Sequence, residues 1–263
     1  MTSATSPNPS EWIVRFPHAN DRCVVRRDLP YASIADQERL MDVYLPLEGD
    51  GPHAAVIIAS GYPTAGLRHH LGRSARHFGA ARSWGELCAS YGVAEIAYDA
   101  VDPIADLPAL IDHVRRHADT LGLAASRLGL FACSGNAPVA LANCHTHIEC
   151  AVVLYGFTFD DGHRDAVARA ARQFGFANPQ SLDAVDRIPQ SLRMLIVRAG
   201  LDAFDGLNEG IDAFVAAALA RNLPLTLINH ANAVHAFDLL DEGERTRRII
   251  RDVLQFLKDE LSM

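Results

Sequence analysis

The sequence has no long apolar run and no excess of positive charge. No stretch approaches the ~18 consecutive apolar residues of a membrane span, and residues 1–12 (MTSATSPNPSEW) do not have the basic-then-apolar layout of a signal peptide. The formal net charge of -8 disfavours a nucleic-acid partner, because phosphate groups repel an acidic surface. These absences predict a cytoplasmic protein that binds neither a membrane nor nucleic acid.

Cysteine is scarce and metal-binding motifs are lacking. The five cysteines are an odd number at irregular spacing, which indicates reduced thiols and not a disulfide framework. Histidines gather at 69–77 and at 145–147, but no HExxH or CxxC arrangement occurs. We therefore expect no metal ion and no cofactor.

The composition is that of a globular protein. With 263 residues, 49% of them hydrophobic and 21% charged, the chain is long enough to bury a substantial core. We expect a flexible tail at 1–10 and a single domain over 11–263, since large α/β folds often reach this size as one unit. Homo-oligomers are compatible with this composition, which does not indicate an oligomeric state.

Strand-like and helix-like segments alternate along most of the chain. Strand-like segments at 12–16, 23–27 and 40–46 come first and suggest an antiparallel start. The later predicted strands are 54–60, 93–100, 127–133, 150–156, 193–200 and 223–230. The predicted helices are about 74–91, 106–117, 137–144, 164–176, 208–222 and about 241–261, with a short helix before 193. This alternation predicts an α/β fold: one mostly parallel, doubly wound sheet with helices on both faces.

Three residues that could form a nucleophilic site lie shortly after predicted strands. Ser134 follows RLGLFAC, Asp202 follows RMLIVRAG, and His235 lies in the loop after LTLINH. Sites in such sheets gather at the carboxyl ends of the strands, so we expect these side chains to meet. A serine hydroxyl needs an imidazole to take its proton, and the imidazole needs a carboxylate to fix its tautomer.

These motifs resemble those of the α/β-hydrolases, in particular the dienelactone hydrolase and esterase branch. The resemblance rests on LMDVYLP, AAVIIASGYP, RLGLFACSGNAPVALA, LIVRAGLD and HAFD, and on the chain order Ser, Asp, His. It covers nearly the whole chain from about residue 40. It implies a sheet of about eight strands and a serine hydrolase that cleaves a small ester, thioester or lactone through an acyl-enzyme.

Cysteine is the rival nucleophile, because many dienelactone hydrolases use one at this turn. The tight turn crowds the residue two places before the nucleophile, where a small residue is needed. Ser134 has Ala132 at that place, whereas Cys133 would have Phe131. We therefore predict that Ser134 attacks and that Cys133 is a buried strand residue.

The base and the carboxylate each have a second candidate. His230 ends a strand, but His235 lies further into the loop and is followed by Ala-Phe-Asp, as in the family. Asp202 matches the family's G-x-D, and Asp205 is the alternative, which also fits a solvated cap before the next helix. We predict His235 and Asp202.

Asn136 stands where the G-x-S-x-G turn usually has its second glycine. Its amide either caps the following helix, whose first turn contains Pro138, or points into the site and binds substrate. We favour the cap and keep Asn136 among the candidate substrate-binding residues.

The resemblance also implies donors for an oxyanion. These are the backbone N–H of Gly135 and that of Tyr62, directly after Gly61 in SGYP, where Ser60 replaces the family's frequent histidine. Gly61 would border the substrate. Tyr62 as plain loop packing is the other interpretation.

A basic segment follows this loop. Arg68, Arg73 or Arg76 could bind an anionic part of the substrate by forked hydrogen bonds, with Arg68 and Arg73 the main candidates. A solvated, charged helix start is the favoured alternative. Roughly 35 residues near 158–190 exceed a usual connection and predict a small helical lid.

The same fold admits other functions. A peptidase or amidase would use the same three side chains, and some members of the fold bind small ligands without catalysis. The altered turn at Asn136 keeps the second alternative open, whereas Ser134, Asp202 and His235 favour an enzyme with a small-molecule substrate.

Overall fold

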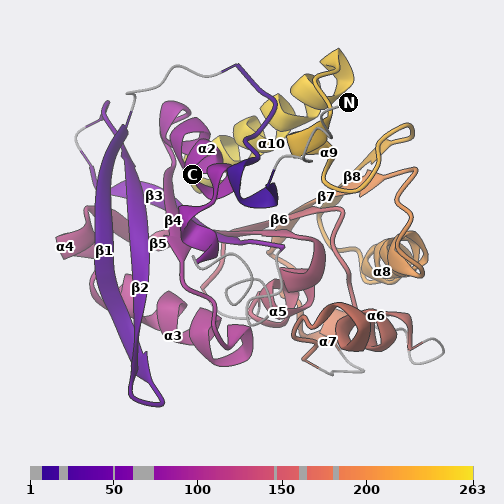
Figure 1. Ribbon diagram of the computed structural model, residues 1–263, viewed down its shortest axis with the longest axis horizontal. Coiled ribbons are helices and arrows are strands. Elements are labelled where there is room, and N and C mark those ends of the chain that lie inside the picture. Colours follow the sequence, from indigo (N-terminus) through magenta and orange to yellow (C-terminus); the bar gives the residue numbers. More distant parts are fainter. Residues whose placement is uncertain are drawn as a thin grey trace, which may run out of the picture.

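One eight-stranded sheet runs through the computed structural model, which describes residues 8–17, 23–49, 51–61, 74–144, 147–159, 165–179 and 184–262 (Figure 1). Its strands are β1 (Cys23–Ile34), β2 (Gln37–Pro46), β3 (His53–Ala59), β4 (Ala94–Tyr98), β5 (Leu123–Cys133), β6 (Cys150–Leu154), β7 (Arg193–Ala199) and β8 (Leu225–His230). The spatial order is β1-β2-β4-β3-β5-β6-β7-β8. Only the β1–β2 and β2–β4 pairs are antiparallel, so the predicted mostly parallel sheet is confirmed.

The central strands are apolar because both of their faces are covered. Strands β4 and β6 are buried at every position, and β3 at every position after its first. The buried side chains form two clusters, one on each face of the sheet. Strand β8, at the edge, is mostly exposed or half-buried.

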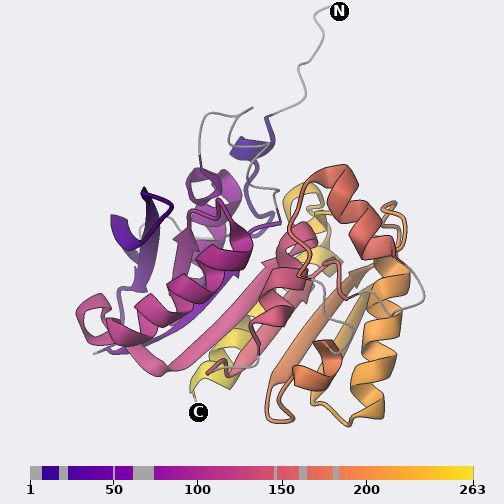
Figure 2. The ribbon, with the colours of Figure 1, turned by 90° about the horizontal axis from the view of Figure 1, so that it is seen from below.

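Helices cover both faces, as the alternating pattern predicts (Figures 1 and 2). Helices α2 (Gly79–Ser90) and α10 (Glu244–Ser262) supply one cluster, and α3 (Pro103–Arg116), α5 (Ala137–Ala142) and α8 (Leu207–Ala220) supply the other. The shorter helices are α4 (Ala118–Leu121), α6 (Ala166–Phe174), α7 (Ala184–Arg187) and α9 (Phe237–Leu240). The 3-10 turns are η1 (Pro9–Glu11), η2 (Ala75–His77) and η3 (Ser134–Asn136).

The segment at 12–16 is not the predicted strand. The Val14 N–H donates to Ser83 Oγ at 2.9 Å and the Arg15 N–H donates to the Asp238 carbonyl at 2.7 Å, so this segment packs on helices and not in the sheet. Ser10 is already buried beside it, within η1. Packed structure therefore begins before residue 11; residues 1–7 of the expected tail lie outside the described residues.

Helix α3 begins at Pro103, earlier than the predicted start at Asp106. Pro103 suits the first turn, where its missing N–H needs no partner. The Asp106 carboxylate accepts hydrogen bonds from the Val101 and Asp102 N–H groups at 2.6 and 2.7 Å. Asp106 thus supports the start of the helix from within its first turns, and does not precede it.

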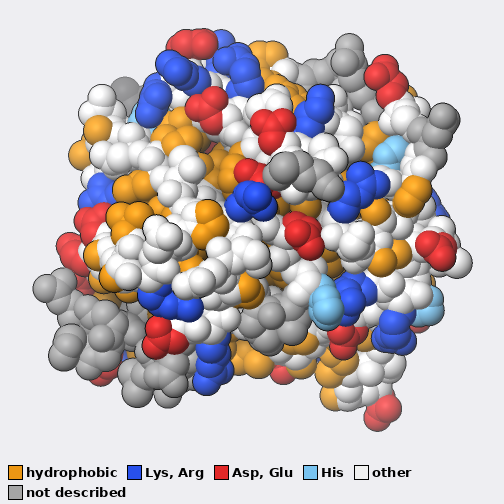
Figure 3. Space-filling view, turned by 180° about the vertical axis from the view of Figure 1, so that it is seen from behind, with side chains coloured by type: hydrophobic (Ala, Val, Ile, Leu, Met, Phe, Trp, Pro, Cys, Tyr) orange, Lys and Arg blue, Asp and Glu red, His pale blue; other side chains and the backbone are white. Residues whose placement is uncertain are grey.

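The surface carries charges of both signs. Figure 3 shows Lys and Arg side chains scattered among Asp and Glu on the face turned away from the viewer in Figure 1. Within the described part of the chain, no helix combines the length and the apolar character that crossing a bilayer would demand.

The contact between α2 and the sheet depends on Gly85. A Cβ atom there would lie 2.6 Å from Cγ of the Tyr44 ring on β2. Gly85→Ala should lower the free energy of unfolding by roughly 1–3 kcal/mol, because overpacking outweighs the better helix propensity of alanine. Urea unfolding measures this change in the free energy of unfolding. Arg82→Ala, an exposed change on the same helix, is the control and should stay within ~0.5 kcal/mol; equal stability of the two variants would contradict this packing.

Candidate active site

Ser134 stands on a sharp turn between strand β5 and helix α5. Its φ of 51° lies in the left-handed region, which residues other than glycine rarely adopt. The turn is crowded by the loop after β3, since a Cβ at Gly61 would lie 2.7 Å from the Ser134 Cβ. A glycine is therefore required at position 61, and it lets two strand ends meet beneath the serine.

The structure brings Ser134, His235 and Asp202 into one hydrogen-bonded chain. His235 Nε2 lies 2.8 Å from Ser134 Oγ, and His235 Nδ1 lies 2.6 Å from Asp202 Oδ2. The Asp202 side chain is fully buried, and its Oδ1 accepts a hydrogen bond from the Phe204 N–H at 3.1 Å. The carboxylate is thus held in place from its far side while it faces the imidazole.

Two rings and two joined loops hold the imidazole. The rings of Tyr155 and Phe204 stand edge-on to His235, with centroids 4.8 and 4.5 Å from its own. The loops that carry Asp202 and His235 also touch, because a Cβ at Gly200 would lie 2.4 Å from the Ala231 carbonyl oxygen. Glycine at 200 allows the close approach that brings acid and base together.

The rival residues lie in other surroundings. Cys133 is buried, and burial raises the pKa of its thiol well above the usual range, so the thiolate is disfavoured. His230 Nε2 lies 3.1 Å from Thr246 Oγ1. Asp205 forms an exposed ion pair with Arg169 at 2.9 Å. The hydrogen-bonded chain therefore contains the favoured residue of each pair.

Asn136 does not make the capping hydrogen bond that the sequence favoured. It occupies the position before α5, but its side chain makes no capping hydrogen bond. The side-chain amide instead donates to the Ser60 carbonyl, at the end of β3, and Asn136 Oδ1 is buried without a partner among the described residues. The expected cap is replaced by a bond that ties the serine turn to the loop after β3, and a contact between Asn136 and substrate stays a prediction.

A cavity of about 290 Å³ opens beside Ser134 and His235. Gly61 and Gly135 border it. Aromatic rings make up much of its wall, contributed by Trp12, Phe78, Trp84, Tyr98, Tyr155, Phe157, Phe174, Phe176 and Phe204. Phe174 and Phe176 come from the predicted lid segment. The cavity suits a ligand with substantial apolar surface.

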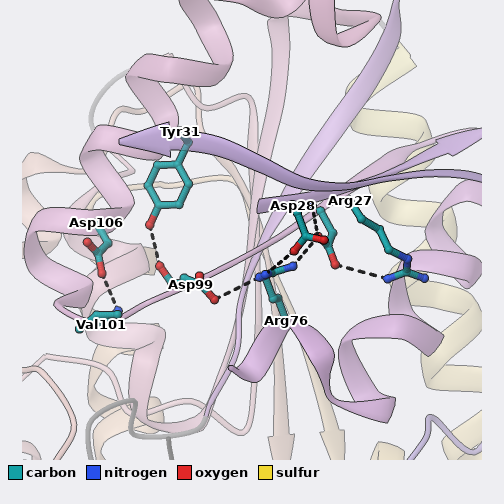
Figure 4. A network of polar contacts seen from close by, with 8 residues as sticks. Arg27, Asp28, Tyr31, Arg76, Asp99, Val101 and Asp106 are labelled. Atoms are coloured by element: carbon teal, nitrogen blue, oxygen red, sulfur yellow. Dashed lines mark hydrogen bonds and ion pairs between the residues drawn. The ribbon is translucent and has the colours of Figure 1, made fainter. Parts of the chain in front are cut away.

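Arg76 borders the cavity but is bound by carboxylates (Figure 4). Its Nη1 lies 2.6 Å from Asp42, its Nη2 2.7 Å from Asp28 and its Nε 3.2 Å from Asp99. The Arg76 side chain is only 4% exposed, and those of Asp42 and Asp99 are buried as well. Arg76 therefore joins β1, β2 and the residue after β4 to the segment before α2, and is not the solvated charge that we favoured.

Three predicted residues cannot be placed. Tyr62, Arg68 and Arg73 lie outside the described residues, so their expected roles as oxyanion donor and substrate ligands stay predictions. In the described part of the chain, no group of three or more His, Cys, Asp or Glu side chains is arranged to hold a metal ion.

Two buried carboxyl groups at the cavity escaped the sequence analysis. Asp238 accepts hydrogen bonds from Tyr155 Oη at 2.6 Å and Trp84 Nε1 at 3.0 Å, and so links the residues after His235 to α2 and to the end of β6. Burial raises the pKa of Asp238, and the two hydrogen bonds oppose that rise. Glu95 lies in the buried strand β4. A glutamate inside the apolar run VAEIAY was the signal that could have found it.

Comparisons with known proteins find solved structures that share this fold. No protein-family model matches the sequence, and a search of curated protein sequences finds no match either. Among solved structures, a bacterial heroin esterase is similar with a TM-score of 0.70 and 14% identity, over 92% of this chain and 85% of the other. Carboxyl esterase 2 of the mycorrhizal fungus Tuber melanosporum has a TM-score of 0.68 at 15% identity, over 99% and 95% of the two chains. A truncated carbohydrate esterase from gut microbiota has a TM-score of 0.67 at 16% identity, over 92% and 99%.

These likenesses show the fold. The eight-stranded sheet, its helices and its order agree with the α/β-hydrolase fold, and the predicted fold class is confirmed. A serine hydroxyl that is hydrogen-bonded to an imidazole can be activated as a nucleophile when the imidazole is itself hydrogen-bonded to a buried carboxylate.

Because Arg76 is paired with buried carboxylates, we expect its substitution to cause a large loss of stability. Arg76→Met leaves the buried carboxylates of Asp42 and Asp99 without this cation, and should lower the free energy of unfolding by roughly 3–5 kcal/mol. Arg169→Met, which breaks the exposed pair with Asp205, is the matched control and should cost less than about 1 kcal/mol. Urea unfolding measures the stability of both variants. Similar losses of stability would contradict this expectation, because the ion pairs of Arg76 would then contribute no more than one exposed pair.

Proposed function

We propose that this protein is a serine hydrolase that cleaves carboxylic esters. The single observation that carries the proposal is the hydrogen-bonded chain Ser134–His235–Asp202, whose serine and histidine border an apolar cavity. The esterase neighbours support it, since their fold is shared. The likeness of fold is a weaker argument than the side-chain geometry, because one fold hosts many functions.

In the proposed reaction, His235 Nε2 takes the proton of Ser134 as its Oγ attacks the ester carbonyl carbon. Asp202 stabilises the resulting imidazolium through Nδ1–H. The tetrahedral intermediate collapses when the imidazolium gives its proton to the leaving alcohol, which leaves an acyl group on Ser134. Water then attacks the acyl-enzyme, with His235 again the base, and releases the carboxylic acid.

The oxyanion of that intermediate needs donors beside Ser134. The Gly135 N–H, at the start of the turn into α5, is one proposed donor, and the Tyr62 N–H remains the second. The bond from Asn136 to the Ser60 carbonyl supports this assignment, because it links the turn that carries the first donor to the loop that would carry the second. Asn136 is then a positioning residue, although it stands where the motif usually has glycine.

The aromatic wall favours a small substrate with an apolar acyl or alcohol part. Thioesters and lactones remain within the proposal, since the same attack opens them. The dienelactone hydrolase-like branch also remains a proposal, supported by the sequence motifs. Helices α6 and α7 fall within 158–190, and Phe174 and Phe176 border the cavity, which supports a small lid over the site.

Substitution of the serine tests the proposed nucleophile. Ser134→Ala should abolish labelling by a fluorophosphonate and lower the rate of p-nitrophenyl acetate hydrolysis about 10⁴-fold or more, since the attacking oxygen is removed. Cys133→Ala is the matched control and should keep both labelling and turnover. Labelling that disappears in Cys133→Ala and persists in Ser134→Ala would reverse the assignment.

The same assay separates the alternative functions. A wild-type protein that takes no label and has no turnover would favour a ligand-binding protein. Faster cleavage of a p-nitroanilide than of the matching p-nitrophenyl ester would favour an amidase or peptidase. Either result would overturn the proposal.

Asn136 has its own test. Asn136→Ala removes the hydrogen bond to Ser60, so the turnover number should fall about tenfold while KM stays within about twofold, because donors that act mainly in the transition state are displaced. Asn143→Ala is the matched control, since its amide donates to the Val139 carbonyl within α5 and borders no part of the cavity. A rise in KM with an unchanged turnover number would contradict the positioning role.

A further inference from the structure

Glu95 occupies the middle of strand β4, where a charged residue is unexpected. It pairs with Tyr44 of β2 and with Val56 of β3. Its neighbours Ala94 and Ile96 belong to the cluster on the α3 face, so the alternation of a strand directs Glu95 toward the α2 face. Its side chain therefore lies between the sheet and α2.

The carboxyl group of Glu95 has no polar partner in the described part of the chain. Both oxygens are buried and neither makes a hydrogen bond there, and the residue is 0% exposed. Burial, followed by the charge of Asp42, raises the pKa of Glu95 well above its usual range. The group is thus held as the neutral acid, which has one O–H donor and a carbonyl acceptor. Such groups are normally satisfied, because a buried unpaired donor or acceptor costs free energy.

The same cavity borders both Glu95 and Ser134. Through the sheet register Glu95 is level with Val56 of β3 and Gly129 of β5, four residues before the end of β5 at Cys133, which at a rise of about 3.3 Å per residue is roughly 13 Å below the turn that carries Ser134. The other lining residues on this side of the sheet include Ile58, Ala81, Trp84 and Ala97. Glu95 is thus a polar residue on the wall of a largely apolar cavity, well below the edge of the sheet where Ser134 stands.

We propose that Glu95 forms the inner end of a substrate subsite that accepts an uncharged hydroxyl or carboxamide group, an inference that rests on the proposed ester hydrolysis. A hydroxyl or carboxamide group can accept a hydrogen bond from the O–H of a neutral carboxyl group and donate one to its carbonyl oxygen. An ammonium group is disfavoured because a neutral carboxyl group supplies no negative charge to offset the cost of taking a cation out of water. A carboxylate is disfavoured because the nitrogens of Arg76 are already bound by Asp28, Asp42 and Asp99. The substrate class is therefore an ester with an apolar stem and a neutral polar end.

The first test compares substrates of the wild-type protein. The probes are p-nitrophenyl esters of ω-hydroxyalkanoic acids of increasing chain length, each paired with the alkanoate that has methyl in place of hydroxyl. A second pair of series carries the same groups on the alcohol side of acetate esters. At one chain length in either series, kcat/KM should favour the hydroxyl ester by about tenfold, the factor expected for hydrogen bonds to a buried group.

Variants then assign the preference to Glu95. Glu95→Gln keeps a donor and an acceptor in nearly the same shape and should retain the preference. Glu95→Met keeps the length without polar atoms and should lose it. Glu149→Met, an exposed change directly before β6, is the matched control and should behave like the wild type. The ratio of kcat/KM for paired esters is insensitive to the fraction of folded enzyme, so an unstable variant still gives a result.

Three results would overturn the subsite. One is equal kcat/KM for the paired esters at every chain length in both series. Another is a preference that survives in Glu95→Met. The third is faster cleavage of ω-amino esters that is lost in Glu95→Gln, which would indicate a cation site. Failure of the proposed function looks different: the wild type would cleave neither member of any pair.

Discussion

The left-handed turn at Ser134 is the constraint on which the site depends. A non-glycine residue holds this backbone only when its surroundings compensate for the strain. Here Gly61 lets the loop after β3 lie against the serine, and Asn136 ties that loop to the turn. One strained residue thus sets the serine hydroxyl above the sheet, within 2.8 Å of His235. The cavity and the imidazole are arranged around that point.

Arg76 and Asp238 are buried polar groups that border the same cavity as Ser134, and each joins elements that are distant in sequence. Arg76 connects the segment before α2 to carboxylates on β1, β2 and the end of β4. Asp238 connects the residues after His235 to α2 and to the end of β6. Such clusters need complete pairing, since a lone buried charge is costly. Glu95 differs from Arg76 and Asp238, because both oxygens of its carboxyl group lack a partner in the described part of the chain, which is why it points to a ligand.

Much of the fold could be predicted from the local pattern of residues. Continuous apolar runs such as AAVIIAS became buried parallel strands because helices cover both faces. The pattern failed at 12–16, where WIVRF reads as a strand but packs on helix α2 and beside Asp238. An apolar, β-branched run reports that a segment is buried, and what it is buried against depends on distant residues. The predicted cap by Asn136 was wrong for a related reason, because the side chain binds Ser60, which is 76 positions away in the sequence.

The sequence by itself determined the class of fold and the order of the reactive residues, because strand and helix periodicity and short turn motifs are local. It also favoured Ser134 over Cys133 through the sizes of Ala132 and Phe131. Only the tertiary structure shows that His235 and Asp202 are hydrogen-bonded in a chain to Ser134 while His230 and Asp205 have other partners. It alone shows that Arg76 is bound by carboxylates and is not solvated. Those choices depend on which loops meet at the carboxyl edge of the sheet and on how far each side chain is removed from water. Neither distance nor burial is a property of a short stretch of sequence.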